Sequence, residues 1–107
     1  MADYYYHLDT SEQFGRLRRL RPELLQSFGA FNAKAFEEGA LSQKVKELIA
    51  VAAAHITRCP YCISGHTKRA KQLGATDEEV AEAIFVAAAM NAGASMAHST
   101  IAMKALE

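Results

Sequence analysis

The sequence lacks a net charge, a long apolar run and any repeated segment. Its 107 residues include 12 basic and 12 acidic side chains, so no overall field would attract nucleic acid or an anionic membrane. The basic residues between Arg16 and Arg21 are interrupted by leucines, which is typical of a solvated helix face. The apolar run at 48–54 is far shorter than the about 18 residues that a membrane span needs. We therefore expect neither a nucleic-acid partner nor a membrane partner.

The N-terminal segment also lacks the features of a signal peptide. Residues 1–6 contain neither a positively charged start nor an apolar stretch. We therefore expect a cytoplasmic protein. In that reducing compartment, two cysteines are seldom a structural disulfide and are more often catalytic, redox-active or metal-binding.

The composition is rich in apolar residues for so short a chain. A chain of this length has room for one domain, 1–107, and buries roughly 60 to 68% of its unfolded surface. Yet 50% of its residues are hydrophobic, which is high for a soluble domain. The surplus of apolar surface indicates a partner subunit.

Capping patterns, prolines and glycines divide the chain into about six predicted helices. The β-branched residues are too scattered to alternate as strands, so we expect an all-α, single-domain helical bundle. Capping boxes at 9–13 and 76–79 and prolines at 22 and 60 mark helix starts. Gly39 is expected to end the second helix as a left-handed cap, and Gly74 is expected to end the fourth. The third helix should span about 43–58, the fifth should end at Met90, and Asn91-Ala92-Gly93 should break the chain before a last helix at about 94–106.

Glu47 lies where the third predicted helix turns apolar. The second half of that helix is apolar nearly all round, which predicts burial at the domain centre or at a subunit contact. From position alone, we expect Glu47 to be solvated, as most helix glutamates are. If it is buried instead, it becomes a candidate general base or proton relay.

The segment from Cys59 to His66, CPYCISGH, is the most informative part of the sequence. Pro60 at the first helical position would place Cys59 at the N-cap and Cys62 at the third helical residue, beside unpaired backbone N–H groups. The positive end of a helix stabilises a thiolate, which is the nucleophilic form of cysteine. His66 follows Cys62 by one turn, so imidazole and thiol share a helix face and can exchange a proton. The two cysteines can also close a small disulfide ring.

Two plainer interpretations of these cysteines remain open. A structural zinc site needs four ligands, and this motif supplies three, with His55 or His98 as the fourth. Alternatively, both cysteines could be inert core residues. We expect no metal and no cofactor, we expect His55 and His98 to be packed or interfacial, and we expect a structural role for Asn91.

The motif resembles the active-site signature of a known family. Glu47, followed by the pattern Cys59-x-Tyr61-Cys62-x-x-x-His66, is similar to the signature of the AhpD-like alkylhydroperoxidases, within the carboxymuconolactone decarboxylase family. The similarity includes the flanking segments at 39–50 and 74–79 and covers about residues 20–107, the expected core. It implies an AhpD-like helical bundle completed by oligomerisation, as a trimer or hexamer.

The resemblance also implies a role for each matched residue. Cys62 would be the peroxidatic thiol, and Cys59 would be the resolving thiol that receives electrons from a reductant. Glu47 and His66 would form the proton relay that deprotonates Cys62. Tyr61 matches the motif as well, and a role as an aromatic wall is at least as well supported as a chemical one.

The expected activity is therefore thiol-dependent reduction of organic hydroperoxides, and of hydrogen peroxide as a further substrate. The expected electron donor is a dithiol, for which the resemblance suggests a dihydrolipoyl-bearing protein. Three alternatives stay open: a protein disulfide reductase or redox relay, a decarboxylase or lactone-processing enzyme of the same family, and a zinc-binding module. The presence of both cysteines argues against the decarboxylase.

Overall fold

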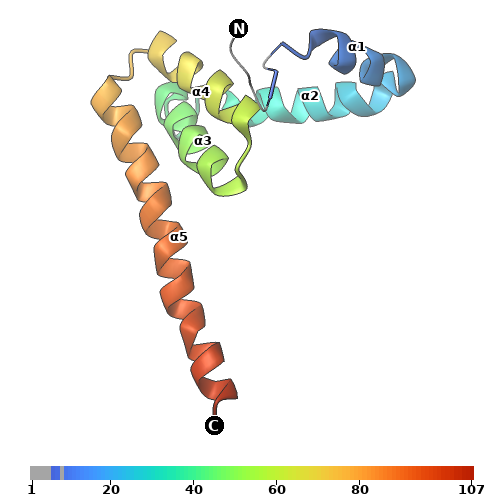
Figure 1. The fold of residues 1–107 in the computed structure, drawn as a ribbon. Helices are drawn as coiled ribbons and strands as arrows, with labels where there is room; N and C mark the ends of the chain where they lie inside the picture. Colours follow the sequence, from blue (N-terminus) through green and yellow to red (C-terminus); the bar gives the residue numbers. More distant parts are fainter. Residues whose placement is uncertain (1–5, 8) are drawn as a thin grey trace, which may run out of the picture. The chain divides into compact units, whose positions relative to one another are not determined.

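The computed structural model describes residues 6–7 and 9–107, and every regular element in this part of the chain is an α-helix. The helices are α1 (Ser11–Leu20), α2 (Pro22–Phe36), α3 (Gln43–Thr57), α4 (Pro60–Gln72) and α5 (Asp77–Ala105) (Figure 1). The all-α prediction is confirmed. The chain forms two compact units, one ending at Gln43 and one spanning Lys44–Glu107.

The first unit consists of α1 and α2. The Asp9 carboxylate accepts hydrogen bonds from the backbone N–H and the hydroxyl of Ser11, at 3.3 and 2.8 Å, and the hydroxyl bond above all lowers the pKa of Asp9. The capping box predicted at 9–13 is wrong in detail, because the N-cap residue Thr10 makes no side-chain capping bond. Pro22 begins α2 as predicted. No residue of either helix is buried, so this unit has no closed core of its own.

The end of α2 differs from the prediction at Gly39. The helix ends at Phe36 because Glu37 is extended, with φ −61° and ψ 149°. Among the described glycines, a positive φ occurs at Gly74, so Gly39 is not a left-handed cap. Its backbone N–H instead donates to the carbonyl oxygen of Leu41 at 3.1 Å, within the turn that leads into α3.

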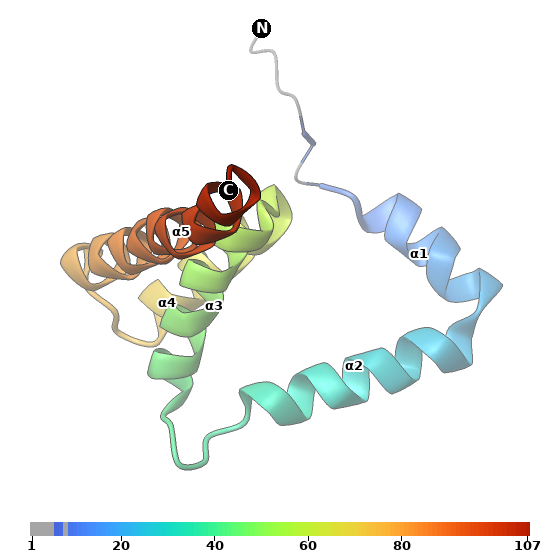
Figure 2. The ribbon, with the colours of Figure 1, turned by 90° about the horizontal axis from the view of Figure 1, so that it is seen from below.

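The second unit contains α3, α4 and α5. Figures 1 and 2 show α3 and α4 next to each other, and α5 makes its contact with α4. The core of this unit consists of small side chains, which allow helices to approach closely. Its buried apolar residues are Val51, Ala54, Ala70, Ala75 and Ala87.

Two tight connections hold the ends of α4. Arg58, with φ 60°, lies between α3 and α4 in the left-handed region, and Cys59 N–H then donates to Ala54 O at 3.1 Å. At the other end, Gly74 has φ 94° and closes α4 as predicted. These connections place Cys59 immediately after α3 and at the start of α4.

The start of α5 is a complete capping box, as predicted. Thr76 Oγ1 accepts from Glu79 N–H at 3.0 Å, and Glu79 Oε1 accepts from Thr76 N–H at 2.9 Å. The bond from Thr76 N–H is the main reason that the pKa of Glu79 is lowered. The contribution of Glu79 to the cap is therefore present at neutral pH and is lost as the pH falls. Lys44 of α3 also contacts Glu79, at 2.9 Å.

The predicted break at Asn91-Ala92-Gly93 is wrong, because α5 continues without interruption to Ala105. The described residues therefore form five helices rather than six. Glycine within a helix costs about 1 kcal/mol relative to alanine. Alanines surround this segment on both sides, and their high helix propensity offsets that cost.

Most of α5 is uncovered in the single chain. Every residue of 88–107 is exposed. By length and composition alone, α5 could cross a membrane. Its most apolar 18-residue window has a mean hydropathy of 1.4, and 6% of that window is buried in the structure. A core helix of a soluble protein passes the same test, so this property alone assigns no location.

Candidate active site

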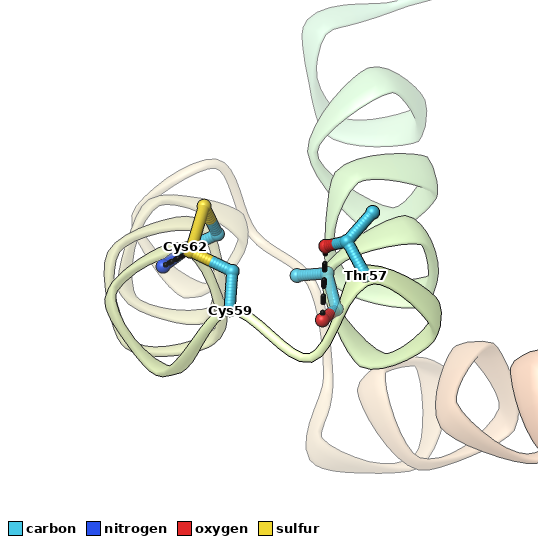
Figure 3. The surroundings of a disulfide bond; sticks show 4 residues. Thr57, Cys59 and Cys62 are labelled. Carbon is cyan, nitrogen blue, oxygen red and sulfur yellow. Dashed lines mark hydrogen bonds between the residues drawn. A yellow bond between two sulfur atoms is a disulfide. The ribbon is translucent and has the colours of Figure 1, made fainter.

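The first turn of α4 holds both cysteines. Pro60 occupies the first turn, Cys59 is the N-cap residue, and the Cys59 sulfur accepts a hydrogen bond from Cys62 N–H at 3.2 Å. The two sulfurs are joined as a disulfide, with the Cα atoms 5.3 Å apart (Figure 3). The predicted placement of both cysteines at this helix end is confirmed, and the small ring that they can close is present.

The disulfide lies within reach of solvent. Cys59 and Cys62 are half-buried, and Tyr61 between them is 44% exposed. Figure 3 shows the sulfurs at the start of α4 beside the last turn of α3, where the Thr57 hydroxyl donates to Ala54 O at 3.4 Å. The segment that carries the disulfide is thus only partly covered by the rest of the chain.

Glu47 is buried, so the expectation from position alone that it is solvated is wrong. It is 3% exposed and is the one buried charged residue among those described. A signal for its burial was present in the sequence. Glu47, Val51 and Ala54 follow one another at spacings of four and three, so they share one face of α3, and all three are buried.

The Glu47 carboxylate contacts His66 of α4. His66 Nδ1 is 2.6 Å from Glu47 Oε2, and the two side chains are 21% and 4% exposed. A carboxylate can only accept, so Nδ1 carries the hydrogen and donates it. In a neutral His66 ring, Nε2 is then left as the proton acceptor. The structure thus brings together two sequence-predicted site residues that lie 19 positions apart.

Arg69 is a neighbour of this pair that sequence reasoning missed. Its Nη1 atom is 3.6 Å from Glu47 Oε1, and its side chain is 56% exposed. Arg69 follows His66 by three residues on α4, so both side chains emerge from one helix face. That spacing, taken together with a buried carboxylate on the preceding helix, was the signal that could have identified it.

The other predicted histidines lie outside this cluster. The Nδ1 atom of His55 is 2.7 Å from the carbonyl oxygen of Val51 on its own helix, so it donates there. His98 is exposed in the second half of α5. Within the described part of the chain, no group of three or more His, Cys, Asp or Glu side chains is placed to hold a metal ion.

These groups can carry out thiol–disulfide chemistry coupled to proton transfer. When the disulfide is reduced, two thiols lie at the positive end of α4, where a thiolate is favoured. His66 lies four residues after Cys62 on the same helix, and the carboxylate that can stabilise its imidazolium form contacts its Nδ1 atom.

Comparison with known proteins places the chain in a family. The model of the carboxymuconolactone decarboxylase family matches residues 22–105, which include every residue of the cluster described above. The chain belongs to the carboxymuconolactone decarboxylase family. The resemblance noted in the sequence is thereby confirmed at the level of the family.

Relatives of this family member match it over most of their length. A protein from the cox locus of Paracoccus denitrificans is 45% identical over 97 residues, which are 91% of this chain and 87% of the relative. A second relative is a carboxymuconolactone decarboxylase family protein from Legionella pneumophila, whose apo crystal structure is known. Its sequence is 37% identical to this one, and its structure superposes with a TM-score of 0.73 over 91% of this chain and 87% of the Legionella chain. A protein of known crystal structure from Methanobacterium thermoautotrophicum is 35% identical in sequence, with a TM-score of 0.76 over 79% of this chain and 96% of the Methanobacterium chain.

We predict that His66→Ala slows alkylation of reduced Cys62 at neutral pH. In a Cys59→Ser background Cys62 is the remaining thiol of the chain, and loss of the proton acceptor should reduce its rate on the order of tenfold. The measurement is the rate of reaction with iodoacetamide across pH. His7→Ala removes an exposed histidine outside the second unit and serves as the matched control. Identical pH profiles for the two variants would contradict the assignment of His66.

Proposed function

We propose that this protein is a thiol-dependent peroxidase that reduces organic hydroperoxides through Cys59 and Cys62. The observation that supports it most strongly is the contact between the buried Glu47 carboxylate and His66, one turn from Cys62. A disulfide that only linked two parts of the chain would not require a buried acid–base pair beside it. A buried ion pair often stabilises a fold no better than apolar residues of the same size, so a chemical role would account for its presence.

In the proposed reaction, His66 Nε2 takes the proton of the Cys62 thiol while Glu47 stabilises the resulting imidazolium. The Cys62 thiolate attacks a peroxide oxygen, the O–O bond breaks, and the alcohol leaves with a proton. Cys62 is then a sulfenic acid. The Cys59 thiol attacks its sulfur, water leaves, and the Cys59–Cys62 disulfide forms. The hydroperoxide is reduced by two electrons, which an external dithiol returns to the disulfide.

The proposal gives the two cysteines different roles. Cys62 is the attacking thiol because His66 follows it by one turn on the same helix face. Cys59 is the resolving thiol and the site at which the dithiol donor, such as a dihydrolipoyl-bearing protein, attacks. Tyr61 is proposed as an aromatic wall beside the sulfurs, a role that fits its partial exposure.

A second candidate is a protein disulfide reductase that uses the same pair without a peroxide. The exposure of Tyr61 beside the half-buried disulfide favours it, because a protein substrate needs such access. The two candidates differ in whether a peroxide oxidises the reduced protein. The decarboxylase alternative of the family gains nothing from a Cys59–Cys62 pair.

We further propose that the protein acts in the cytoplasm as a homo-oligomer, a trimer or hexamer, in which other copies cover α5. Residues 83–103 contain no acidic or basic side chain except His98, and large apolar side chains are exposed along the helix. Most of the stability of a helix in a protein comes from packing of its apolar face, and most of α5 is exposed in the single chain. The exposed apolar residues are Phe85, Val86, Met90, Met96, Ile101, Met103 and Leu106.

The function is tested by counting thiols in the reduced protein before and after one equivalent of an organic hydroperoxide. We expect rapid loss of two thiols and formation of one equivalent of alcohol, because both electrons come from the cysteine pair. Cys62→Ser should lose none. Cys59→Ser should react once, as a sulfenic acid, and should not turn over. Retention of both thiols in the native protein would reject the peroxidase and favour the disulfide reductase.

The oligomer is tested by light scattering after size-exclusion chromatography. We expect a mass that is a multiple of the 11.7 kDa chain, and we expect Met90→Glu to lower it, because a charge would enter an apolar contact. Gln72→Glu adds the same charge at an exposed position of α4 and should leave the mass unchanged. A monomer, or a protein that needs detergent to stay in solution, would contradict the proposal.

A further inference from the structure

Arg69 contacts the buried Glu47 carboxylate but has no part in the reaction proposed above. The two carboxylate oxygens have different basic neighbours, His66 Nδ1 at 2.6 Å from Oε2 and Arg69 Nη1 at 3.6 Å from Oε1. Both neighbours come from α4, whereas Glu47 comes from α3. The carboxylate is thus held from two sides by one helix face.

We propose that Arg69 is a positioning residue of the proton relay, acting on Cys62 through Glu47 and His66. It orients the carboxylate so that Oε2 faces His66, and it offsets the carboxylate charge when Cys62 is a thiolate. The inference rests on the proposed function in so far as the relay serves Cys62. It adds a residue that the Glu47, Cys59, Cys62, His66 pattern does not contain.

In the reactive state, the charges of this cluster balance only when Arg69 is included. After proton transfer the cluster holds two anions, the Cys62 thiolate and the Glu47 carboxylate, and one cation, the His66 imidazolium. Arg69 supplies the second cation, so the cluster becomes neutral. Because the Glu47 side chain is 4% exposed, solvent can do little to replace that charge. Without Arg69 an uncompensated negative charge remains, and it disfavours the thiolate.

Two lysines of this unit are paired with other acidic side chains, away from Glu47. Lys44 of α3 pairs with Glu79 at 2.9 Å, and Lys71 of α4 pairs with Asp77 at the start of α5. Lys68, next to Arg69 on α4, is exposed and makes no ion pair with an acidic side chain in the described part of the chain. Lys68 therefore offers a matched control, because its removal changes the net charge of the same helix by the same amount.

The test is the pH profile of Cys62 alkylation by iodoacetamide in the reduced Cys59→Ser protein. We expect Arg69→Met to move the profile to higher pH and to slow the reaction at neutral pH on the order of threefold to tenfold, a modest effect because Arg69 is half exposed. Lys68→Met should leave the profile unchanged. Arg69→Lys should restore part of the rate, since it returns the charge without the planar guanidinium.

A second comparison shows whether Arg69 acts through Glu47. In a Glu47→Gln background, Arg69→Met should add no further change, because the carboxylate on which it acts is absent. Circular dichroism of each variant shows whether the helices are retained, and Arg69→Gln replaces any variant that unfolds. Equal profiles for Arg69→Met and Lys68→Met, or an undiminished effect of Arg69→Met in the Glu47→Gln background, would overturn the inference. The alkylation experiment uses no peroxide. Its result therefore tests the role of Arg69 even if the thiol count rejects the peroxidase proposal.

Discussion

The contact between Glu47 and His66 is the interaction on which the rest of the second unit depends. It joins α3 to α4 through a 2.6 Å hydrogen bond between side chains that are 4% and 21% exposed. Because it fixes which face of α4 turns toward α3, it also fixes where Cys62, one turn earlier, presents its sulfur. Pro60 and the left-handed Arg58 set the start of α4 and thereby the place of the disulfide on that helix.

The small core around this contact has consequences for the whole chain. Alanine side chains let the helices approach closely, but they bury little apolar surface, and the largest fully buried side chain is Val51. A buried ion pair is itself a weak source of stability. The structure therefore combines a charged group at its centre with large apolar side chains on its surface. We propose that the first serves proton transfer and that further copies of the chain cover the second.

The sequence predicted best those features that depend on a few neighbouring residues. Pro60 at the start of α4, Cys59 at its N-cap, Gly74 at its end and the Thr76 capping box are all decided within about one helical turn, and all four are confirmed. The predicted break around Gly93 failed because the alanines on both sides outweigh one glycine and one asparagine. Gly39 failed as a helix end because Glu37 had already left the helix.

The candidate site was harder to predict because its contacts join distant parts of the chain. Burial of Glu47 depends on how α3 faces α4, and a pattern within α3 alone does not determine that. The resemblance to a family paired Glu47 with His66, and the structure places them in contact. Arg69 lies outside the matched pattern, and only the distance between its guanidinium and Glu47 identifies it. Contacts between side chains of different helices become known only when the packing of those helices is known.

The most direct test of the central claim is the rate at which one equivalent of an organic hydroperoxide oxidises Cys62 in reduced Glu47→Gln protein, followed in a stopped-flow instrument. Glu82→Gln, which neutralises an exposed glutamate of α5, is the control. If Glu47 drives proton transfer through His66, the Glu47→Gln rate falls on the order of a hundredfold while Glu82→Gln matches the native protein. Equal rates for all three proteins, with their helices intact, would contradict the account.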